Sequence, residues 1–122
     1  MVRRPSPREL QEYLPLPQAA FHILVALADQ DRHGYAIMQD VASRTDGQLK
    51  LSPGTLYGSI KRLLEAGLIL EIDEPRRQST DDERRRYYRL TKFGREVAEA
   101  EADRLASLLR QARAAGLVPK RV

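Results

Sequence analysis

In the first half of the chain, apolar positions recur at the spacing of an α-helix face, which predicts two helices there. The first covers residues 16–28 and opens at Leu16-Pro17, since proline is tolerated in the first turn of a helix. The second runs from about Gly34 to Thr45 and stops at Asp46-Gly47, where glycine adopts a left-handed conformation at low steric cost. The apolar positions that define these two faces are Phe21, Leu24, Val25, Ala28, Ile37, Met38 and Val41.

A third helix is predicted to begin at Ser52. Its hydroxyl suits the N-cap, because it can accept a hydrogen bond from a helix N–H group, and Pro53 suits the first helical position. Gly67 suits the C-terminal end. One face of this helix carries Leu56, Ile60, Leu63 and Leu64, whereas Thr55, Tyr57, Ser59, Lys61 and Arg62 fall largely off it.

After Gly67 the helical spacing gives way to short apolar runs rich in strand-forming residues. Residues 68–72 and 86–90 are predicted to pair as an antiparallel hairpin. The polar segment 73–85 between them is too long for a tight turn, so we expect an extended loop. Thr91 then caps a final helix, which Gly116 and Pro119 end.

Three helices, a hairpin and one more helix, in this order, indicate a winged helix-turn-helix fold. The fold class is mainly α with a small β-hairpin, which must pack on the helices because an isolated hairpin is marginal in water. We expect an N-terminal arm (1–15), a winged helix-turn-helix DNA-binding domain (16–90), a C-terminal dimerisation helix (91–116) and a tail (117–122).

The net charge of +4 is modest, but its placement is informative. Between Arg76 and Lys92 there are seven cations and three acids, so this segment carries the whole excess. A concentrated basic segment suits a nucleic-acid backbone, because each neutralised phosphate releases counterions. The alternative, which composition alone favours slightly, is a solvated loop that keeps the protein soluble.

The sequence carries no sign of a catalytic or metal site. It has no cysteine, so disulfides and thiolate chemistry are excluded, and His22 and His33 lack the partners of a metal site. The acidic run 81–83 is expected to be solvated, and no phosphate-binding loop, dinucleotide fingerprint or nucleophile–base motif is present. We expect no enzyme and no cofactor. Without a membrane span or secretory signal, we expect a cytoplasmic protein.

Several motifs taken together resemble the PadR family of bacterial regulators. They are His33-Gly34-Tyr35-Ala36-Ile37, Ser52-Pro53-Gly54-Thr55-Leu56-Tyr57 and Arg85-Arg86-Tyr87-Tyr88-Arg89-Leu90-Thr91, and the resemblance covers residues 16–115. It implies a homodimer whose interface lies on the C-terminal helix, and repression relieved by a small-molecule effector. Many relatives carry paired glycines at the wing tip, where this chain has Asp81-Asp82-Glu83. We expect these acids to turn away from DNA or to pair with Arg84–Arg86.

The partner we expect is double-stranded DNA carrying an inverted-repeat operator, with the third helix of each protomer in a major groove. The candidates on this helix are Ser52, Gly54, Thr55, Tyr57, Ser59, Lys61 and Arg62. Gly54 is expected to make room for the duplex, whereas Gly58 could equally make room for a neighbouring helix. The Tyr57 hydroxyl is expected to contact a phosphate, although a core position is the alternative.

Two interpretations remain open for Tyr35 and Arg62, and further candidates lie on the wing. Tyr35 either meets a phosphate at the start of the second helix or packs against the third. Arg62, on the third helix, either contacts a phosphate or pairs with Glu65. The wing candidates Arg84, Arg85 and Arg86 suit a minor groove, although strand alternation lets only one of the last two face DNA.

The final helix is too long for the small preceding domain to cover, so we expect a second copy of the chain to cover its apolar face. The dimerisation candidates are Val97, Glu101, Leu105, Leu108, Leu109 and Ala112. Two rival hypotheses remain, a winged-helix module that binds protein without DNA and, less favoured, an enzyme of unrecognised type. A protein-binding third helix should expose more apolar and aromatic side chains than this one offers.

Overall fold

The computed structural model describes residues 6–73 and 86–118. Within these ranges the chain forms five helices and three short strands. The elements are α1 (Pro7–Gln11), α2 (Gln18–Ala26), β1 (Arg32–His33), α3 (Gly34–Arg44), α4 (Pro53–Glu65), β2 (Ile69–Ile72), β3 (Tyr87–Leu90) and α5 (Lys92–Ala114). None of the described helices is long and apolar enough to cross a membrane.

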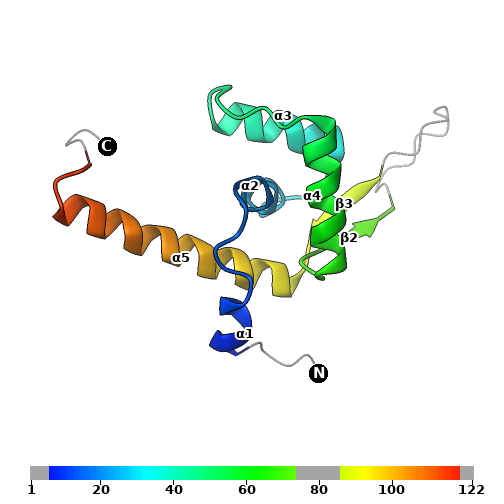
Figure 1. Ribbon diagram of the computed structural model, residues 1–122. Helices are drawn as coiled ribbons and strands as arrows, with labels where there is room; N and C mark the ends of the chain where they lie inside the picture. Colours follow the sequence, from blue (N-terminus) through cyan, green and yellow to red (C-terminus); the bar gives the residue numbers. More distant parts are fainter. Residues whose placement is uncertain (1–5, 74–85, 119–122) are drawn as a thin grey trace.

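Helix α2 lies at the centre of the domain and contacts α3, α4 and α5 (Figure 1). The β-sheet closes one end of the domain. The first part of α5 packs beneath α2, and the rest of this helix projects away from the other elements (Figure 1). The molecule therefore consists of a compact head and a projecting helix.

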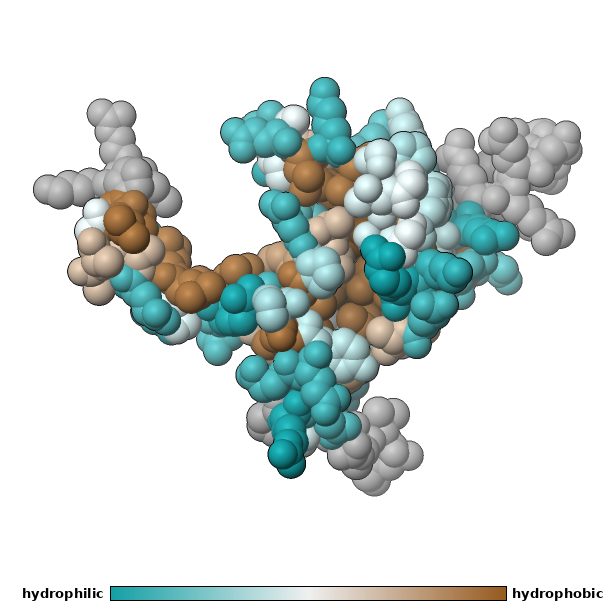
Figure 2. Space-filling view, in the orientation of Figure 1, coloured by the Kyte–Doolittle hydropathy of each residue, from teal (hydrophilic) through white to brown (hydrophobic). Residues whose placement is uncertain are grey.

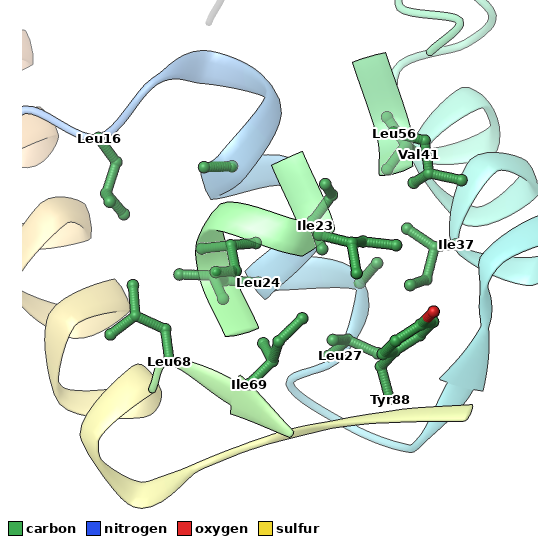
Figure 3. Packing of buried hydrophobic residues seen from close by; sticks show 14 of the residues in the cluster. Leu16, Ile23, Leu24, Leu27, Ile37, Val41, Leu56, Leu68, Ile69 and Tyr88 are labelled. Carbon is green, nitrogen blue, oxygen red and sulfur yellow. The ribbon is translucent and has the colours of Figure 1, made fainter. Parts of the chain in front are cut away.

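The core forms where the apolar faces of α2, α3 and α4 meet the sheet and the start of α5 (Figure 3). Aliphatic side chains dominate it, as expected for a small domain whose stability rests on burying apolar area. The largest fully buried side chains are Ile23, Leu24, Ile37, Val41, Leu56, Leu68, Ile69 and Val97.

The predicted helix ends are confirmed where a cap could be recognised. The Ser52 hydroxyl accepts a hydrogen bond from the Thr55 N–H at 3.1 Å. Thr91 caps α5 in the same way, through the Gly94 N–H at 2.9 Å. Gly67 and Gly116 both have φ of +77°, the left-handed conformation that ends a helix.

The sheet contains one strand more than the predicted hairpin. Its order is β1-β3-β2, with both pairs antiparallel, and His33 of β1 lies opposite Tyr87 of β3. Of the two neighbouring tyrosines of β3, Tyr88 is buried in the core and Tyr87 is half-buried. Burial and the nearby Glu71 carboxylate raise the pKa of the Tyr88 hydroxyl, so this side chain stays neutral.

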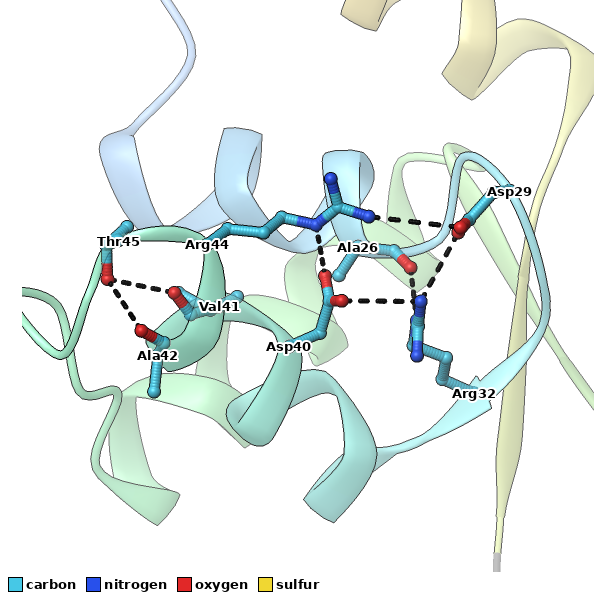
Figure 4. Close-up of polar contacts among 8 residues, drawn as sticks. All are labelled: Ala26, Asp29, Arg32, Asp40, Val41, Ala42, Arg44 and Thr45. Carbon is cyan, nitrogen blue, oxygen red and sulfur yellow. Dashed lines mark hydrogen bonds and ion pairs between the residues drawn. The ribbon is translucent and has the colours of Figure 1, made fainter.

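An ion-pair network fixes the corner between α2 and α3 (Figure 4). Arg32 donates to the Ala26 carbonyl at 2.6 Å, where α2 ends, and its guanidinium lies 3.3 Å from Asp40 of α3. Arg44 donates to Asp40 at 2.6 Å, and Asp29 contacts both arginines. A cation at a helix C-terminus is also favoured by the helix dipole. The network therefore holds α3 at a set position against the central helix.

Candidate nucleic-acid interface

Helix α4 buries one face in the core and presents the opposite face to solvent. The buried residues are Leu56, Ser59, Ile60 and Leu63. The exposed positions include Gly54, Thr55, Tyr57, Lys61 and Arg62, as predicted. Most of these residues are polar or have no side chain, so the polar groove of a binding partner could approach the helix closely.

Ser59 corrects the predicted set, because it is only 4% exposed. The prediction that it belongs to the outer face is wrong. Ser59 lies three residues after Leu56 and four before Leu63, and such spacings share one face of a helix. The spacing therefore places Ser59 among the core leucines despite its polar side chain.

The two helical glycines of α4 have open space in front of them. A Cβ at Gly54 would meet nothing within 4 Å, and one at Gly58 would meet only the Arg62 guanidinium, at 3.8 Å. No neighbouring helix therefore occupies the space in front of Gly58. The alternative that Gly58 makes room for such a helix is wrong. Each glycine costs about 1 kcal/mol relative to alanine in a helix interior, and the fold offers no packing reason to bear this cost.

Tyr57 lies across the junction between α4 and α3. Tyr57 is 50% exposed, and a Cβ at Gly34 would come within 2.9 Å of the tyrosine Cζ atom and closer still to the hydroxyl. Gly34 thus makes room for Tyr57, and the Tyr57 hydroxyl lies beside the first residue of α3. Tyr35 is 60% exposed, so most of its side chain is accessible to a phosphate.

His33 joins the wing to the same junction, a role that the sequence interpretation missed. Its Nδ1 atom accepts a hydrogen bond from the Ala36 N–H at 3.2 Å and so caps α3. Its ring meets Tyr87 of β3 edge-on, with centroids 5.4 Å apart. Histidine is not among the preferred N-cap residues, so the only signal was its place directly before a predicted helix.

Part of the basic segment near the wing is already neutralised. Arg89 donates to Asp31 at 2.9 Å, and this carboxylate raises the pKa of Arg89. Arg86 is well exposed and lies 3.9 Å from Glu71, a surface pair that contributes little energy. Arg84, Arg85 and the acidic tip 81–83 lie outside the described residues.

Arg62 has no ion pair with Glu65 in the described part of the chain. The guanidinium instead extends along α4 beside Gly58. Its side chain is exposed, so it remains available to a phosphate.

The dimerisation candidates on α5 divide into two groups. Val97 is fully buried and Glu101 is 2% exposed, so both pack within the head of this chain and their assignment to an outer face is wrong. Both lie on the part of α5 that packs against the head. Farther along, Leu105, Leu108 and Leu109 are 39%, 47% and 40% exposed, and Ala112 is half-buried. These residues form what we call the leucine face, part of the apolar surface on the projecting half of α5 (Figure 2).

Three helices around a small antiparallel sheet, with α3 and α4 as the helix pair and β2–β3 as the wing, define a winged helix-turn-helix protein. The model of the transcriptional regulator PadR-like family matches residues 23–100. The chain belongs to this family.

The chain is also similar to individual proteins in sequence or in fold. The chain is 40% identical to a 37.1 kDa protein in a transposon of Streptomyces fradiae. The matched segment covers 70% of this chain but only 22% of that protein. A PadR family transcription regulator from Clostridium difficile is similar in structure, with a TM-score of 0.68, 25% identity, and coverage of 80% of this chain and 96% of that one. Bacillus subtilis PadR in complex with operator DNA has a TM-score of 0.58 at 21% identity, over 66% of this chain and 45% of that one.

Proposed function

We propose that this chain binds double-stranded DNA in a sequence-specific manner through the exposed face of α4, and that it regulates transcription. The observation that carries the proposal is the open space before Gly54 and Gly58, with Thr55, Lys61 and Arg62 beside them. Small side chains on the first turns of a recognition helix, with basic side chains in the following turn, suit the major groove. The Bacillus subtilis relative of the same fold was solved with operator DNA, which supports this partner.

The rival hypothesis, a module that binds protein, fits α4 less well. The large exposed apolar residues are Tyr35, Tyr57, Leu70, Leu105, Leu108, Leu109 and Leu117 among the described residues, and only Tyr57 lies on α4. Protein-binding surfaces are enriched in such groups at their centre. The leucine face of α5 fits a protein partner better, and we propose that this partner is a second copy of the chain.

A dimer gives the two α4 helices a fixed separation. Two recognition helices enter successive major grooves when they lie about 34 Å apart, so the dimer requires an inverted repeat. We propose repression as the mode of regulation, with release by a small molecule that acts where α5 meets the head. A shift at this place would change the separation of the α4 helices and thereby the affinity for DNA.

A salt series tests the DNA partner. We expect the dissociation constant for a duplex to rise steeply with salt concentration, because phosphate contacts release counterions. The measurement is fluorescence anisotropy with a labelled random duplex, and the control is heparin, a polyanion without base edges. A duplex affinity that is absent, or that does not change with salt, contradicts the proposal.

Gly58→Ala distinguishes the effect of this residue on stability from its effect on DNA binding. We expect the free energy of unfolding to rise by about 0.5–1 kcal/mol, because nothing in the fold occupies the space of the new methyl group. We expect affinity for the selected operator to fall by about tenfold, because this methyl group stands between the helix and the groove. Urea denaturation and anisotropy measure the two effects.

Ser43→Ala is the matched control, since it adds helix propensity at an exposed position of α3. We expect a gain in stability with no change in operator affinity. If Gly58→Ala also left the affinity unchanged, the outer face of α4 would not be the DNA surface.

A further inference from the structure

Arg32 belongs to a strand of the sheet, but two helices of the head hold its side chain (Figure 4). Its Nε–H donates to the carbonyl of Ala26, the last residue of α2, at 2.6 Å. A different nitrogen, Nη2, lies 3.3 Å from the Asp40 carboxylate of α3. Only 15% of the Arg32 side chain and 14% of the Asp40 side chain are exposed, so water screens this pair little. We call these three residues the Arg32 anchor.

The backbone of Arg32 connects this anchor to the wing. Strand β1 pairs with β3 in the antiparallel sense, and Arg32 lies opposite Tyr88. The next pair ends the ladder at Tyr87, and Arg86 directly precedes that residue in the chain. The anchor therefore joins α2 and α3 to the strand that leads directly to a basic residue of the wing.

Strand β3 is held from both sides. On one side it pairs with β2, which follows α4 in the chain. These two strands alone would form a two-stranded ribbon, which twists more strongly than a larger sheet and is marginal in water. On the other side it pairs with β1, a strand of only two residues. Since so short a strand has few backbone bonds to keep its place, the side chain of Arg32 fixes β1 against the helices.

We propose that Arg32 is a positioning residue that places β3, and with it Arg86, against the DNA half-site that α4 reads. This inference rests on the proposed function. Arginine suits the role because its planar guanidinium donates in two fixed directions at once. Arg86 contributes its full contact to DNA only if the wing is in position before binding, since ordering a loosened wing on binding costs free energy.

Helix α4 does not depend on the anchor in this way. Its apolar face, with Leu56 and Leu63, lies in the core, where α4 packs against α2. Loss of the anchor should therefore weaken the contact that the wing makes with DNA and leave the contact made by α4 intact. A general loss of stability would change both contacts alike or neither.

The test is a set of double-mutant cycles on the operator selected with the wild-type protein, with dissociation constants from fluorescence anisotropy. Arg86→Ala and Lys61→Ala are each measured in the wild type and in Arg32→Met, which keeps an unbranched side chain without the guanidinium. We expect Arg86→Ala to weaken binding about tenfold in the wild type but only about twofold in Arg32→Met. The loss caused by Lys61→Ala should be the same in both backgrounds.

Arg44→Met is the matched control. Arg44 contacts the same two carboxylates as Arg32, those of Asp29 and Asp40, but it lies on α3 and not in the sheet. Arg86→Ala should therefore keep its full effect in this background. Arg32→Lys keeps the charge without the planar fork, so the effect of Arg86→Ala should be intermediate there. This second variant decides if Arg32→Met fails to fold.

The outcomes separate the two proposals. Wild-type protein that selects no operator overturns the proposed function and this inference with it. If the wild type binds its operator, but Arg86→Ala has no effect or the same effect with and without Arg32, only the role of Arg32 is wrong. Equal weakening of the Lys61 and Arg86 effects in Arg32→Met, or a weakened Arg86 effect in Arg44→Met, would also overturn the inference. The first result would indicate a general structural role, and the second would assign the effect to the charge balance around Asp40.

Discussion

Replacing Gly94 with alanine is expected to destabilise the protein by about 3 kcal/mol or more, which is a large part of the stability of a small domain. Gly94 lies in the first turn of α5, where that helix crosses the chain leading into β2. A Cβ there would overlap the Leu68 carbonyl oxygen and come within 2.8 Å of its carbonyl carbon and 3.0 Å of the Leu90 side chain. The first of these atoms is backbone and cannot move aside alone.

The backbone at this crossing carries further hydrogen bonds. The Leu68 carbonyl accepts from the Thr91 N–H at 3.1 Å and from the Thr91 hydroxyl at 3.0 Å. Room for a methyl group would separate α5 from β2 and lengthen or break these bonds. Strand β2 and the N-terminal end of α5 would then lose their contact, so the wing and the projecting helix would both be affected.

Urea denaturation at a fixed protein concentration measures this effect, since the stability of a dimer depends on concentration. Gly54→Ala is the control, because a Cβ there meets nothing within 4 Å. We expect Gly94→Ala to unfold at much lower urea than the wild type and Gly54→Ala to unfold at or above the wild-type midpoint. Equal midpoints for all three proteins would show that α5 does not approach β2 this closely.

The second large effect is expected from a charge on the leucine face. Leu108 is 47% exposed in the single chain and lies between Leu105 and Leu109. Leu108→Glu should prevent dimer formation, because a carboxylate would be buried without a partner. Operator affinity should then fall by about 100-fold or more, since each monomer binds one half-site without the benefit of the second.

Sedimentation and anisotropy with the same samples measure mass and affinity together. Ala114→Glu is the matched control, because it adds the same charge at an exposed position of α5 outside the leucine face. This control should stay dimeric and bind as the wild type does. If Leu108→Glu remains dimeric, the dimer interface lies on another surface. If it is monomeric and binds the operator with full affinity, a dimer is not needed for binding.

The ends of α4 and α5 could be predicted because local residues determine them. Ser52, Thr91, Gly67 and Gly116 act within one turn of the backbone that they cap, so their effect is visible in a short stretch of sequence. The core face of α4 was also predictable from its leucine spacing. Ser59 was predicted on the wrong face because a serine side chain is polar, although its spacing from Leu56 and Leu63 places it in the core.

The features that escaped prediction depend on contacts between distant segments. Strand β1 has only two residues, too few for an alternating pattern, and it forms because β3 offers an open edge. Glu101 is buried where α5 packs against α1 and α2, which are far away in the sequence. Likewise, Gly34 could be matched to a motif, but only the packing of Tyr57 explains why it is glycine.

The central claim is that the exposed face of α4 recognises operator DNA, and selection of bound sequences from random duplexes tests it most directly. Wild-type protein should enrich an inverted repeat. Lys61→Ala should lose preference at one position of each half-site, whereas Arg86→Ala should enrich the same repeat with weaker affinity for most sequences. No enriched sequence from the wild type, or the same repeat bound equally well by all three proteins, would contradict the claim.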